Sequence, residues 1–422
     1  MASKLLADKT ALVIDQGLYV HVAERLALEF GHVFYFCDWR SAFPVPARHH
    51  IGYGLAPNIQ PVINPWLYMD QADVVVFPDV YFGGEQEFLR TRIGKRVWGS
   101  GLADGLELYR TDLKKVLADL DLPTGKFEVI VGVDKLRDYL KAHTETLYVK
   151  GNLFRGTSET FKHTSYATSK RTLDRIDLEL GPRAKFFEFI VERPIEGPEF
   201  GYDASSIDGQ FSNFVSWGYE DKDSWYLGRI VRYDDLPPEI KSINAKLAPL
   251  FEEMAVRSFF STEMRKDDKG NLYVMDPCMR AGSPPSEVYI QAFRNWGEHI
   301  YHGGAGDLVD LEPEDESEIY LAEIILQSDE AGEGFFALEF PEEVRPFVKI
   351  HAHCRVDDID YSAPLGIHEF GAAIGRGKSL EAAITQAKDV ASQIKGMGIH
   401  YNEDASDAIG KIEEGVEYGV EW

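Results

Sequence analysis

The sequence predicts a protein of mixed α/β and α+β class in three parts. These are a Rossmann-like N-terminal domain over residues 1–102, a central α+β domain over 103–317, and a small α/β domain over 318–422. Two observations support this reading. The first hundred residues alternate continuous apolar strands with helices, which is typical of a parallel sheet. In addition, 422 residues are too many for one ordinary hydrophobic core.

The N-terminal elements are predicted from runs of apolar residues. Strands are expected at 10–15, 32–38, 72–78 and 96–98. Helices are expected at 19–30 and after the third strand, ending at Arg92. Strands without an alternating polar face are buried on both sides, as parallel sheets require.

The middle and the end of the chain have a different pattern. A helix is expected at 108–120 and a long one at 238–256, with strands at 146–150 and 186–192 and a hairpin at 259–277. Beyond them, strands are expected at 321–327, 348–354 and 371–375. The last helix is expected at 380–394, because its apolar positions follow helical spacing.

Three potential metal ligands, His351, His353 and Cys354, lie close together in the predicted strand at 348–354. Their alternation favours a strand with exposed imidazole groups over a metal cluster.

Composition excludes several classes of function. The net charge of −26, with no cluster of Lys and Arg, argues against polymeric DNA or RNA as a partner. Three cysteines do not form a disulfide framework in a chain of this length, and they fit a reducing, cytoplasmic compartment. No segment has the pattern of a signal peptide or a membrane span, so we expect a soluble protein without a membrane partner.

The predicted hairpin gathers carboxylates. If it turns near Lys269 and Gly270, Glu263 and Asp276 lie opposite each other on one face. Like charges directly opposite are destabilising, and a divalent cation such as Mg²⁺ would offset them. Arg280 follows on the same face by strand alternation and could stabilise developing negative charge. The alternative is a solvent-exposed hairpin whose charges only keep it soluble.

The segment from Val191 to Phe200 resembles the adenosine-binding segment of the ATP-grasp superfamily, and within it of the phosphoribosylamine–glycine ligases, or glycinamide ribonucleotide synthetases. In that family a Glu and the residues just after it meet the adenine, and a second Glu seven positions on binds the ribose hydroxyls. The resemblance implies that Glu192 and Ile195 face the adenine and that Glu199 holds the ribose.

The same resemblance supplies a set of phosphate-binding residues. Arg110, shortly after Leu106 and Glu107, stands in place of a phosphate-binding lysine, keeping the charge but not its compact shape. Lys150 ends a strand, as the family's second lysine does. The segment 151–158 replaces the usual glycine-rich flap, and its Arg155 would add charge to the phosphate site.

The hairpin matches the family's magnesium-binding strands. Residues 276–282 stand where the family usually has Glu-x-Asn-x-Arg-x-Gly. The match implies that Glu263 and Asp276 bind Mg²⁺ (or Mn²⁺) and that Arg280, with Lys150, is catalytic. Cys278 replaces the Asn, and a thiolate is a poor Mg²⁺ ligand. The site therefore either binds one metal firmly and a second weakly, or is partly degenerate.

The resemblance extends to both ends of the chain. Residues 371–383 and 398–404 resemble the family's last domain, so the order of elements matches over nearly the full length. The family opens with a glycine-rich turn that receives a ribosyl phosphate at a helix N-terminus. Here the turn from Asp15 to Tyr19 has one glycine and an acidic residue, which favours an amine other than phosphoribosylamine.

The function implied by the resemblance is that of an ATP-dependent carboxylate–amine ligase. Such an enzyme activates a carboxylate, here an amino acid, as an acyl phosphate and transfers it to an amine, releasing ADP and phosphate. Its partners would be small molecules, and the protein a monomer or homodimer. Two alternatives stay open: a divergent true phosphoribosylamine–glycine ligase, and a non-catalytic nucleotide-binding protein whose metal site has decayed.

Overall fold

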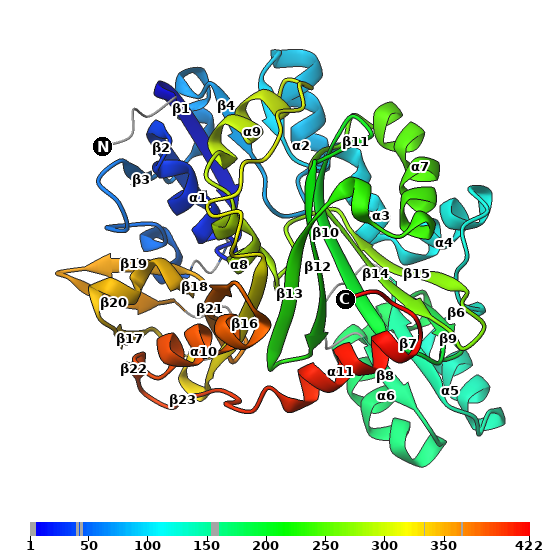
Figure 1. Cartoon of the computed structure of the whole chain (residues 1–422). Coiled ribbons are helices and arrows are strands. Elements are labelled where there is room, and N and C mark those ends of the chain that lie inside the picture. The colour runs from blue at the N-terminus through cyan, green and yellow to red at the C-terminus, as the bar shows by residue number, and fades with distance from the viewer. Residues whose placement is uncertain (1–5, 39–41, 43–44, 153–159, 333, 364–365) are drawn as a thin grey trace.

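The computed structural model describes residues 6–38, 42, 45–152, 160–332, 334–363 and 366–422 (Figure 1). None of the helices in these ranges combines the length and the apolar character that a membrane crossing requires.

The N-terminal part is a parallel sheet, as the sequence predicts. Its described strands lie in the order β3-β2-β1-β4-β5, and every neighbouring pair is parallel. Helix α1 packs on one face, and Phe82 and Leu89, which flank α2, pack on the other. The elements are β1 (Leu6–Asp15), α1 (Val20–Ala27), β2 (Phe30–Cys37), β3 (Ile59–Pro61), β4 (Val74–Val76), α2 (Gly83–Phe88) and β5 (Arg96–Trp98).

A small antiparallel sheet follows, in the order β6-β9-β7-β8. Helices α5 and α6 cover it around a core that includes Leu136, Leu140, Leu173 and Phe189. Its elements are β6 (Phe127–Val131), α5 (Val133–Ala142), β7 (Leu147–Gly151), β8 (Thr160–His163), α6 (Tyr166–Leu180) and β9 (Glu188–Glu192), preceded by α3 (Gly105–Leu108) and α4 (Arg110–Asp119).

The largest sheet is antiparallel and has the path β15-β14-β10-β12-β13-β16-β21-β18. It crosses the predicted boundary at residues 317 and 318, because β13 pairs with β16. Three of its central strands, β10, β12 and β13, were not predicted from the sequence. Its elements are β10 (Glu199–Ile207), β11 (Gln210–Phe211), β12 (Phe214–Asp221), β13 (Trp225–Arg232), β14 (Arg257–Lys266), β15 (Leu272–Cys278), β16 (Tyr320–Ser328), β18 (Val348–Ile350), β21 (Glu369–Gly377) and β23 (Ile399–His400).

Helices and one further small sheet complete the fold. The described strands of that sheet lie in the order β19-β20-β17-β22. The remaining elements are α7 (Pro238–Glu253), α8 (Ser286–Tyr289), α9 (Trp296–Gly303), β17 (Phe336–Glu339), β19 (His353–Val356), β20 (Ile359–Ser362), α10 (Leu380–Ala391), β22 (Lys395–Gly396) and α11 (Ser406–Glu417).

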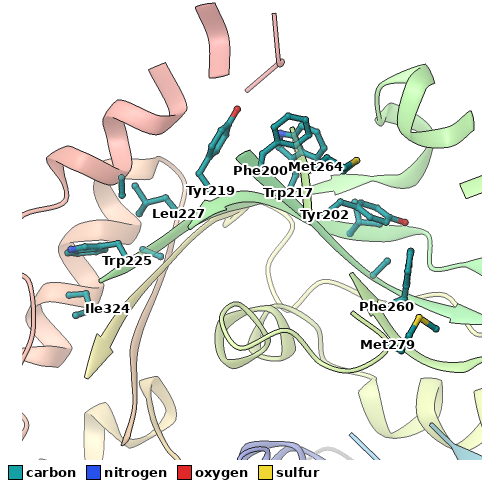
Figure 2. Packing of buried hydrophobic residues seen from close by; sticks show 14 of the residues in the cluster. Phe200, Tyr202, Trp217, Tyr219, Trp225, Leu227, Phe260, Met264, Met279 and Ile324 are labelled. Atoms are coloured by element: carbon teal, nitrogen blue, oxygen red, sulfur yellow. The ribbon is translucent and has the colours of Figure 1, made fainter. Parts of the chain in front are cut away.

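The main core lies on one face of the large sheet. Figure 2 shows its aromatic and aliphatic side chains on the convex side of the curved strands, where α7, α10 and α11 cover them. Trp225 and Tyr219 are both fully buried there. Alternation along each strand sends the neighbouring side chains to the concave face. That face carries polar side chains, and over the rest of its area apolar ones such as Ile207, Phe259 and Leu321, which pack in the core shared with the N-terminal sheet.

Three glycines cross the concave face in register. Gly201 pairs with Gly218, and Gly218 pairs with Gly228, on β10, β12 and β13. The buried side chain of Tyr226 lies over two of them, Gly218 and Gly228, and its hydroxyl is 2.7 Å from the Ser216 hydroxyl. A Cβ atom at Gly218 would overlap the Tyr226 hydroxyl and lie 2.6 Å from the carbonyl oxygen of Leu227. Glycine therefore makes room for the tyrosine ring.

The prediction of one strand over 348–354 with exposed imidazoles is wrong. The strand breaks at Ala352, whose φ is +49°, so β18 joins the large sheet and β19 joins a different one. His351 and His353 are 1% and 3% exposed, since each imidazole packs against a carboxylate, Glu287 and Asp360 respectively. Both partners lie outside the predicted strand, so alternation along it could not reveal them.

We expect Gly218→Ala to lower the free energy of unfolding by about 1–3 kcal/mol, the usual cost of overpacking a core. The physical reason is the overlap with Tyr226. Gly410→Ala in α11 is the matched control, because a Cβ there meets nothing within 4 Å. Urea denaturation measures both, and equal stability of Gly218→Ala and the wild-type protein would contradict this packing.

Candidate active site

Lys150 joins the small sheet to the large one. It lies at the end of β7, and its Nζ donates to Asp276 Oδ2 on β15 at 2.7 Å. The same Nζ lies 3.1 Å from Glu192 Oε2 on β9. Burial alone would lower the pKa of Lys150, but the charges of Asp276 and Glu192 raise it, so the ammonium stays charged. One buried cation thus holds two facing sheets together.

A second lysine, which the sequence reading missed, lies beside the first. Lys114 on α4 is 2% exposed, and its Nζ lies 2.7 Å from Glu192 Oε1. Glu192 is therefore held by a lysine on each carboxylate oxygen, with Lys150 on the other. Arg110 lies one helical turn before Lys114, and its Nη1 donates to the Gly151 carbonyl at 2.8 Å. Arg110 and Lys114 are four residues apart, so they lie on the same side of a helix. This spacing is the sequence pattern that could have revealed Lys114 as a second cation of the site.

The predicted adenosine segment folds around an arginine that was also missed. Arg265 on β14 donates from Nε to Glu199 Oε2 at 2.8 Å, and its Nη2 lies 2.7 Å from the same oxygen. Its Nη1 donates to the carbonyl oxygens of Ile195 and Gly197, at 3.2 Å each. This fixes the segment between β9 and β10, with Ile195 half-buried. Arg265 follows Glu263 by two residues in the predicted hairpin, so both side chains lie on the same face of the strand. This spacing could have revealed Arg265 from the sequence.

The two predicted metal ligands lie close together on the concave face. The β14–β15 pairing shifts by one residue between Thr262 and Met264, so Glu263 lies opposite the bulge at Met275 and Asp276. Burial, reinforced by the nearby charge of Glu199, raises the pKa of Glu263 to about 8. Burial would also raise the pKa of Asp276, but the charge of Lys150 lowers it well below its usual range. Asp276 is thus paired with Lys150, whereas Glu263 forms no salt bridge within the part of the chain that the structure describes.

More acidic side chains face Glu263. Burial raises the pKa of Glu220 to about 7, and that of Asp203 to about 8. Lys222 supplies a counter-charge from the turn between β12 and β13, and its Nζ lies 3.8 Å from Glu199 Oε1. The excess of carboxylates over cations on this face favours the binding of a cation.

A divalent metal fits this donor set in part. Within the described ranges, no group of three or more His, Cys, Asp and Glu side chains could hold a metal ion. Glu263 and Asp276 nevertheless offer hard oxygen ligands of the kind Mg²⁺ prefers, and Mg²⁺ usually completes its coordination with phosphate oxygens and water. The residues therefore fit a metal that arrives with a nucleotide better than one bound by the protein alone.

Arg280 lies at the junction of three segments. Its Nε donates to Glu107 Oε1 at 2.8 Å, and its Nη1 donates to the Tyr19 hydroxyl at 2.9 Å. Burial opposes the charge, but Glu107 and its neighbours raise the pKa of Arg280 further, so it remains a cation. Cys278 is half-buried two residues earlier, and its strand partner is Ser261.

Asp15 ends β1, and its side chain lies in the turn between β1 and α1. Its carboxylate is fully buried and accepts hydrogen bonds from the backbone N–H groups of Gln16 at 2.6 Å and Tyr19 at 2.9 Å. The Tyr35 hydroxyl donates a third at 2.6 Å. Burial raises the pKa of Asp15 to about 6. Two of the backbone N–H groups that an anionic ligand could use at this turn are occupied by the protein's own carboxylate.

The structure brings together most of the residues predicted as a site. Arg155 lies outside the described residues. The predicted residues gathered in the described part of the chain, on or between the two facing sheets, are Arg110, Lys150, Glu192, Ile195, Glu199, Glu263, Asp276 and Arg280.

Comparison with known proteins identifies solved structures that share this fold. No protein-family model matches the sequence, and no curated protein matches it either. Among solved structures, phosphoribosylamine–glycine ligase from Thermotoga maritima is similar over 93% of this chain and 99% of its own, with a TM-score of 0.71 and 16% identity. The biotin carboxylase domain of 2-oxoglutarate carboxylase from Hydrogenobacter thermophilus was solved as a dimer with MgADP, ADP and bicarbonate. It is similar over 98% of this chain and 99% of its own, with a TM-score of 0.64 and 14% identity. L-amino acid ligase from Bacillus licheniformis is similar over 93% of this chain and 99% of its own, with a TM-score of 0.58 and 14% identity.

The chain has the ATP-grasp fold. The predicted fold class is confirmed, since a parallel N-terminal sheet is followed by antiparallel sheets in the ATP-grasp order. At these identities the likeness concerns the fold, and the chemistry of the site depends on its own residues.

We expect Lys150→Ala to lower the free energy of unfolding by about 3 kcal/mol, near the lower end for a broken buried ion pair because Asp276 reaches solvent. The loss leaves two acids without their shared cation. Lys162→Ala on β8, where the lysine is exposed, is the control. Equal urea midpoints for the two variants would contradict the bridging role of Lys150.

We also expect the stability of the ligand-free protein to fall between about pH 4 and pH 8, in part through Asp203. Its pKa is raised in the folded state to about 8 from 3.8, so folding opposes its ionisation and stability is lost as pH rises. Asp203→Asn should weaken this pH dependence, whereas Asp268→Asn in the exposed hairpin turn should not. Urea denaturation at pH 5 and pH 8 would contradict the account if the two variants behaved alike.

Proposed function

We propose that this protein is an ATP-dependent ligase that activates a carboxylate as an acyl phosphate and transfers the acyl group to an amine. The supporting observation is the position of Lys150, which meets Asp276 across the gap between the two sheets, with Glu263 beside it. A buried lysine next to acids that fit a metal–phosphate complex is suited to phosphoryl transfer, where catalysis depends on charge and positioning. The likeness to two ligases supports the same class of reaction.

ATP would bind between the small sheet and the large one. The segment fixed by Arg265 would receive the adenosine, with Glu192 and Ile195 towards the adenine and Glu199 towards the ribose. Arg110 and Lys150 would hold the phosphates, and Arg155 would add charge from the adjoining segment. Glu263 and Asp276 would hold Mg²⁺ or Mn²⁺, which when bound supplies charge neutralisation for the phosphate oxygens.

Nucleotide binding would change the partners of Lys150. In the ligand-free protein its ammonium neutralises Asp276. When phosphates and a metal are present, Lys150 can turn to the phosphates and Asp276 to the metal. Each charge then keeps an opposite charge, so the exchange avoids leaving a buried ion unpaired.

The chemistry would proceed in two steps. A carboxylate oxygen of the substrate, an amino acid by likeness to the ligases, attacks the γ-phosphorus in line, and the bond to ADP breaks with its electron pair on ADP. The amine nitrogen then attacks the acyl carbon of the acyl phosphate. Phosphate leaves, and the proton released by the amine passes to phosphate or solvent. Arg280, held in place by Glu107 and Tyr19, would stabilise the negative charge on the tetrahedral intermediate.

The three predicted segments would divide this work. Residues 1–102 and 318–422 would flank the acceptor end of the site, and 103–317 would carry the nucleotide. We further propose that the protein is cytoplasmic and acts on small molecules as a monomer or homodimer. All three cysteines are free thiols, which suits a reducing compartment.

The direct test is Mg²⁺-dependent ADP release from ATP with each amino acid supplied singly, in the presence of hydroxylamine to trap an acyl phosphate as a hydroxamate. We expect one or a few amino acids to support both ADP release and hydroxamate formation. Glu263→Ala should reduce both by at least about 100-fold, comparable to losing a main charge-stabilising contact. ADP release that ignores every carboxylate would overturn the proposal.

A second candidate is a non-catalytic nucleotide-binding protein, which Cys278 at a metal-binding position favours. In a working site, Cys278→Asn should lower the Mg²⁺ concentration for half-maximal activity several-fold, because an amide oxygen is a better ligand than sulfur. Cys278→Ser separates the loss of sulfur from the gain of the amide. Unchanged metal dependence in both variants, measured also by Mn²⁺ binding with ADP, would favour the decayed site.

A further inference from the structure

A cluster of buried polar side chains lies where the N-terminal sheet, the loop after β15 and the C-terminal strands meet. It lies outside the nucleotide site described above and has no role yet in the proposed reaction. We name it the junction cluster, and its members are His21, Ser283, Glu287, Glu323, His351 and Glu369.

Glu287 is at the centre of the junction cluster. Its Oε1 accepts a hydrogen bond from Ser283 Oγ at 2.8 Å and lies 3.1 Å from His351 Nε2. Its Oε2 accepts from Ser286 Oγ at 3.2 Å, and that hydroxyl lies 3.2 Å from His21 Nε2. Burial opposes the charge of Glu287, but His351 lowers the pKa of this carboxyl, so the two form an ion pair.

Among the residues that the structure describes, several polar atoms of the junction cluster have no hydrogen-bond partner. Glu323 is fully buried, and its Oε1 accepts from the backbone N–H of Val288 at 2.7 Å while its Oε2 makes no hydrogen bond. His351 Nδ1 is likewise without a hydrogen bond and lies 3.9 Å from Glu369 Oε1. Buried polar atoms are normally satisfied, so unsatisfied ones on this scale call for a ligand or water.

The junction cluster is connected to the reacting end of the proposed nucleotide site. The Tyr19 hydroxyl accepts from Arg280 Nη1 at 2.9 Å, and the rings of Tyr19 and His21 meet edge to face at 5.9 Å. Ser283 follows Arg280 by three residues and is half-buried. Glu369 is the accessible carboxylate of the cluster, with 26% of its side chain exposed, whereas the side chains of His351 and Glu287 are 2% exposed. An incoming molecule would therefore meet Ser283 and Glu369 first.

The accessible carboxylate of the junction cluster suits a cation. Glu287 is paired with His351, and burial raises the pKa of Glu323 well above its usual range, so that group is neutral. Glu369 is left as the carboxylate that can receive a cation, with Asp15 nearby and Lys349 as a counter-charge. A phosphate group would meet the buried Asp15 carboxylate at the adjoining turn, where Asp15 already accepts from the backbone N–H groups of Gln16 and Tyr19. The backbone N–H of Ala352 also donates to the Gly17 carbonyl at 2.6 Å, which covers this turn with the C-terminal part of the chain.

We propose that the junction cluster binds the amine acceptor, and that this acceptor is an ammonium-bearing small molecule without a phosphate group. This inference rests on the proposed ligase function and narrows its second substrate. Glu369 and Ser283 contact the incoming amine, and Glu287 with His351 holds Ser283 in position. The acceptor's ammonium group then pairs with the Glu369 carboxylate, and its nitrogen passes one proton to solvent before it attacks the acyl carbon.

The test compares two nucleophiles in one enzyme, using the carboxylate that supports hydroxamate formation. Hydroxylamine is small and neutral at pH 7, so it reports acyl phosphate formation without needing the junction cluster. Ethanolamine, 1,4-diaminobutane and O-phosphoethanolamine are the amine probes. We expect the first two to be acylated and O-phosphoethanolamine to be used at least tenfold less well.

Variants locate the amine site. Glu369→Gln should raise the KM for 1,4-diaminobutane at least tenfold relative to that for hydroxylamine, and Ser283→Ala should act in the same direction. Glu381→Gln, an exposed acid at the start of α10, should leave the ratio unchanged. The inference would be overturned if no amine probe were acylated by an enzyme that forms hydroxamate, if O-phosphoethanolamine were used equally well, or if Glu369→Gln kept the wild-type ratio. Absence of hydroxamate in the wild-type protein would instead count against the proposed function.

Discussion

The arrangement of the site depends on one buried ion pair between two sheets. Lys150 reaches from β7 to Asp276 on β15, while Glu192 and Lys114 fix it from the side of the small sheet. Such a network is costly to bury, and breaking it leaves charges that nothing else neutralises. The two sheets are therefore joined by charged groups that could instead pair with a nucleotide and a metal.

The large sheet carries the main core on one face and the acidic residues of the candidate site on the other. Its convex face carries the aromatic core under α7, α10 and α11 (Figure 2). Its concave face carries Glu263, Asp203 and Glu323, whose buried carboxyls have raised pKa values because burial penalises their charge. In the ligand-free protein these carboxyls are therefore largely protonated at pH 7. A cation bound beside them would favour their charged form.

Periodicity in the sequence was sufficient for the parallel sheet and for the hairpin at Glu263 and Asp276. It was not sufficient for β10, β12 and β13, whose glycines at 201, 218 and 228 interrupt the expected strand pattern. Gly218 and Gly228 are explained by the ring of Tyr226, which lies over both in the folded chain. A local pattern contains no information about such a distant neighbour.

Neighbours that are distant in the sequence also limited the prediction of the candidate site. Resemblance located Lys150 and Glu199, but their partners Lys114 and Arg265 become evident only when α4 and β14 are brought against the adenosine segment. His351 was predicted to be exposed, because its partner Glu287 lies 64 residues away in the sequence. Charged groups are the hardest to place from sequence, since their role depends on which opposite charge the fold brings to them.

The most direct measurement is a crystal structure of the protein with ADP and Mg²⁺. The account predicts that the nucleotide lies between the small sheet and the large one, that Lys150 contacts a phosphate, and that Asp276 has turned from Lys150 to the metal with Glu263. Nucleotide bound elsewhere, or bound there with the ion pair of Lys150 and Asp276 still intact, would contradict it.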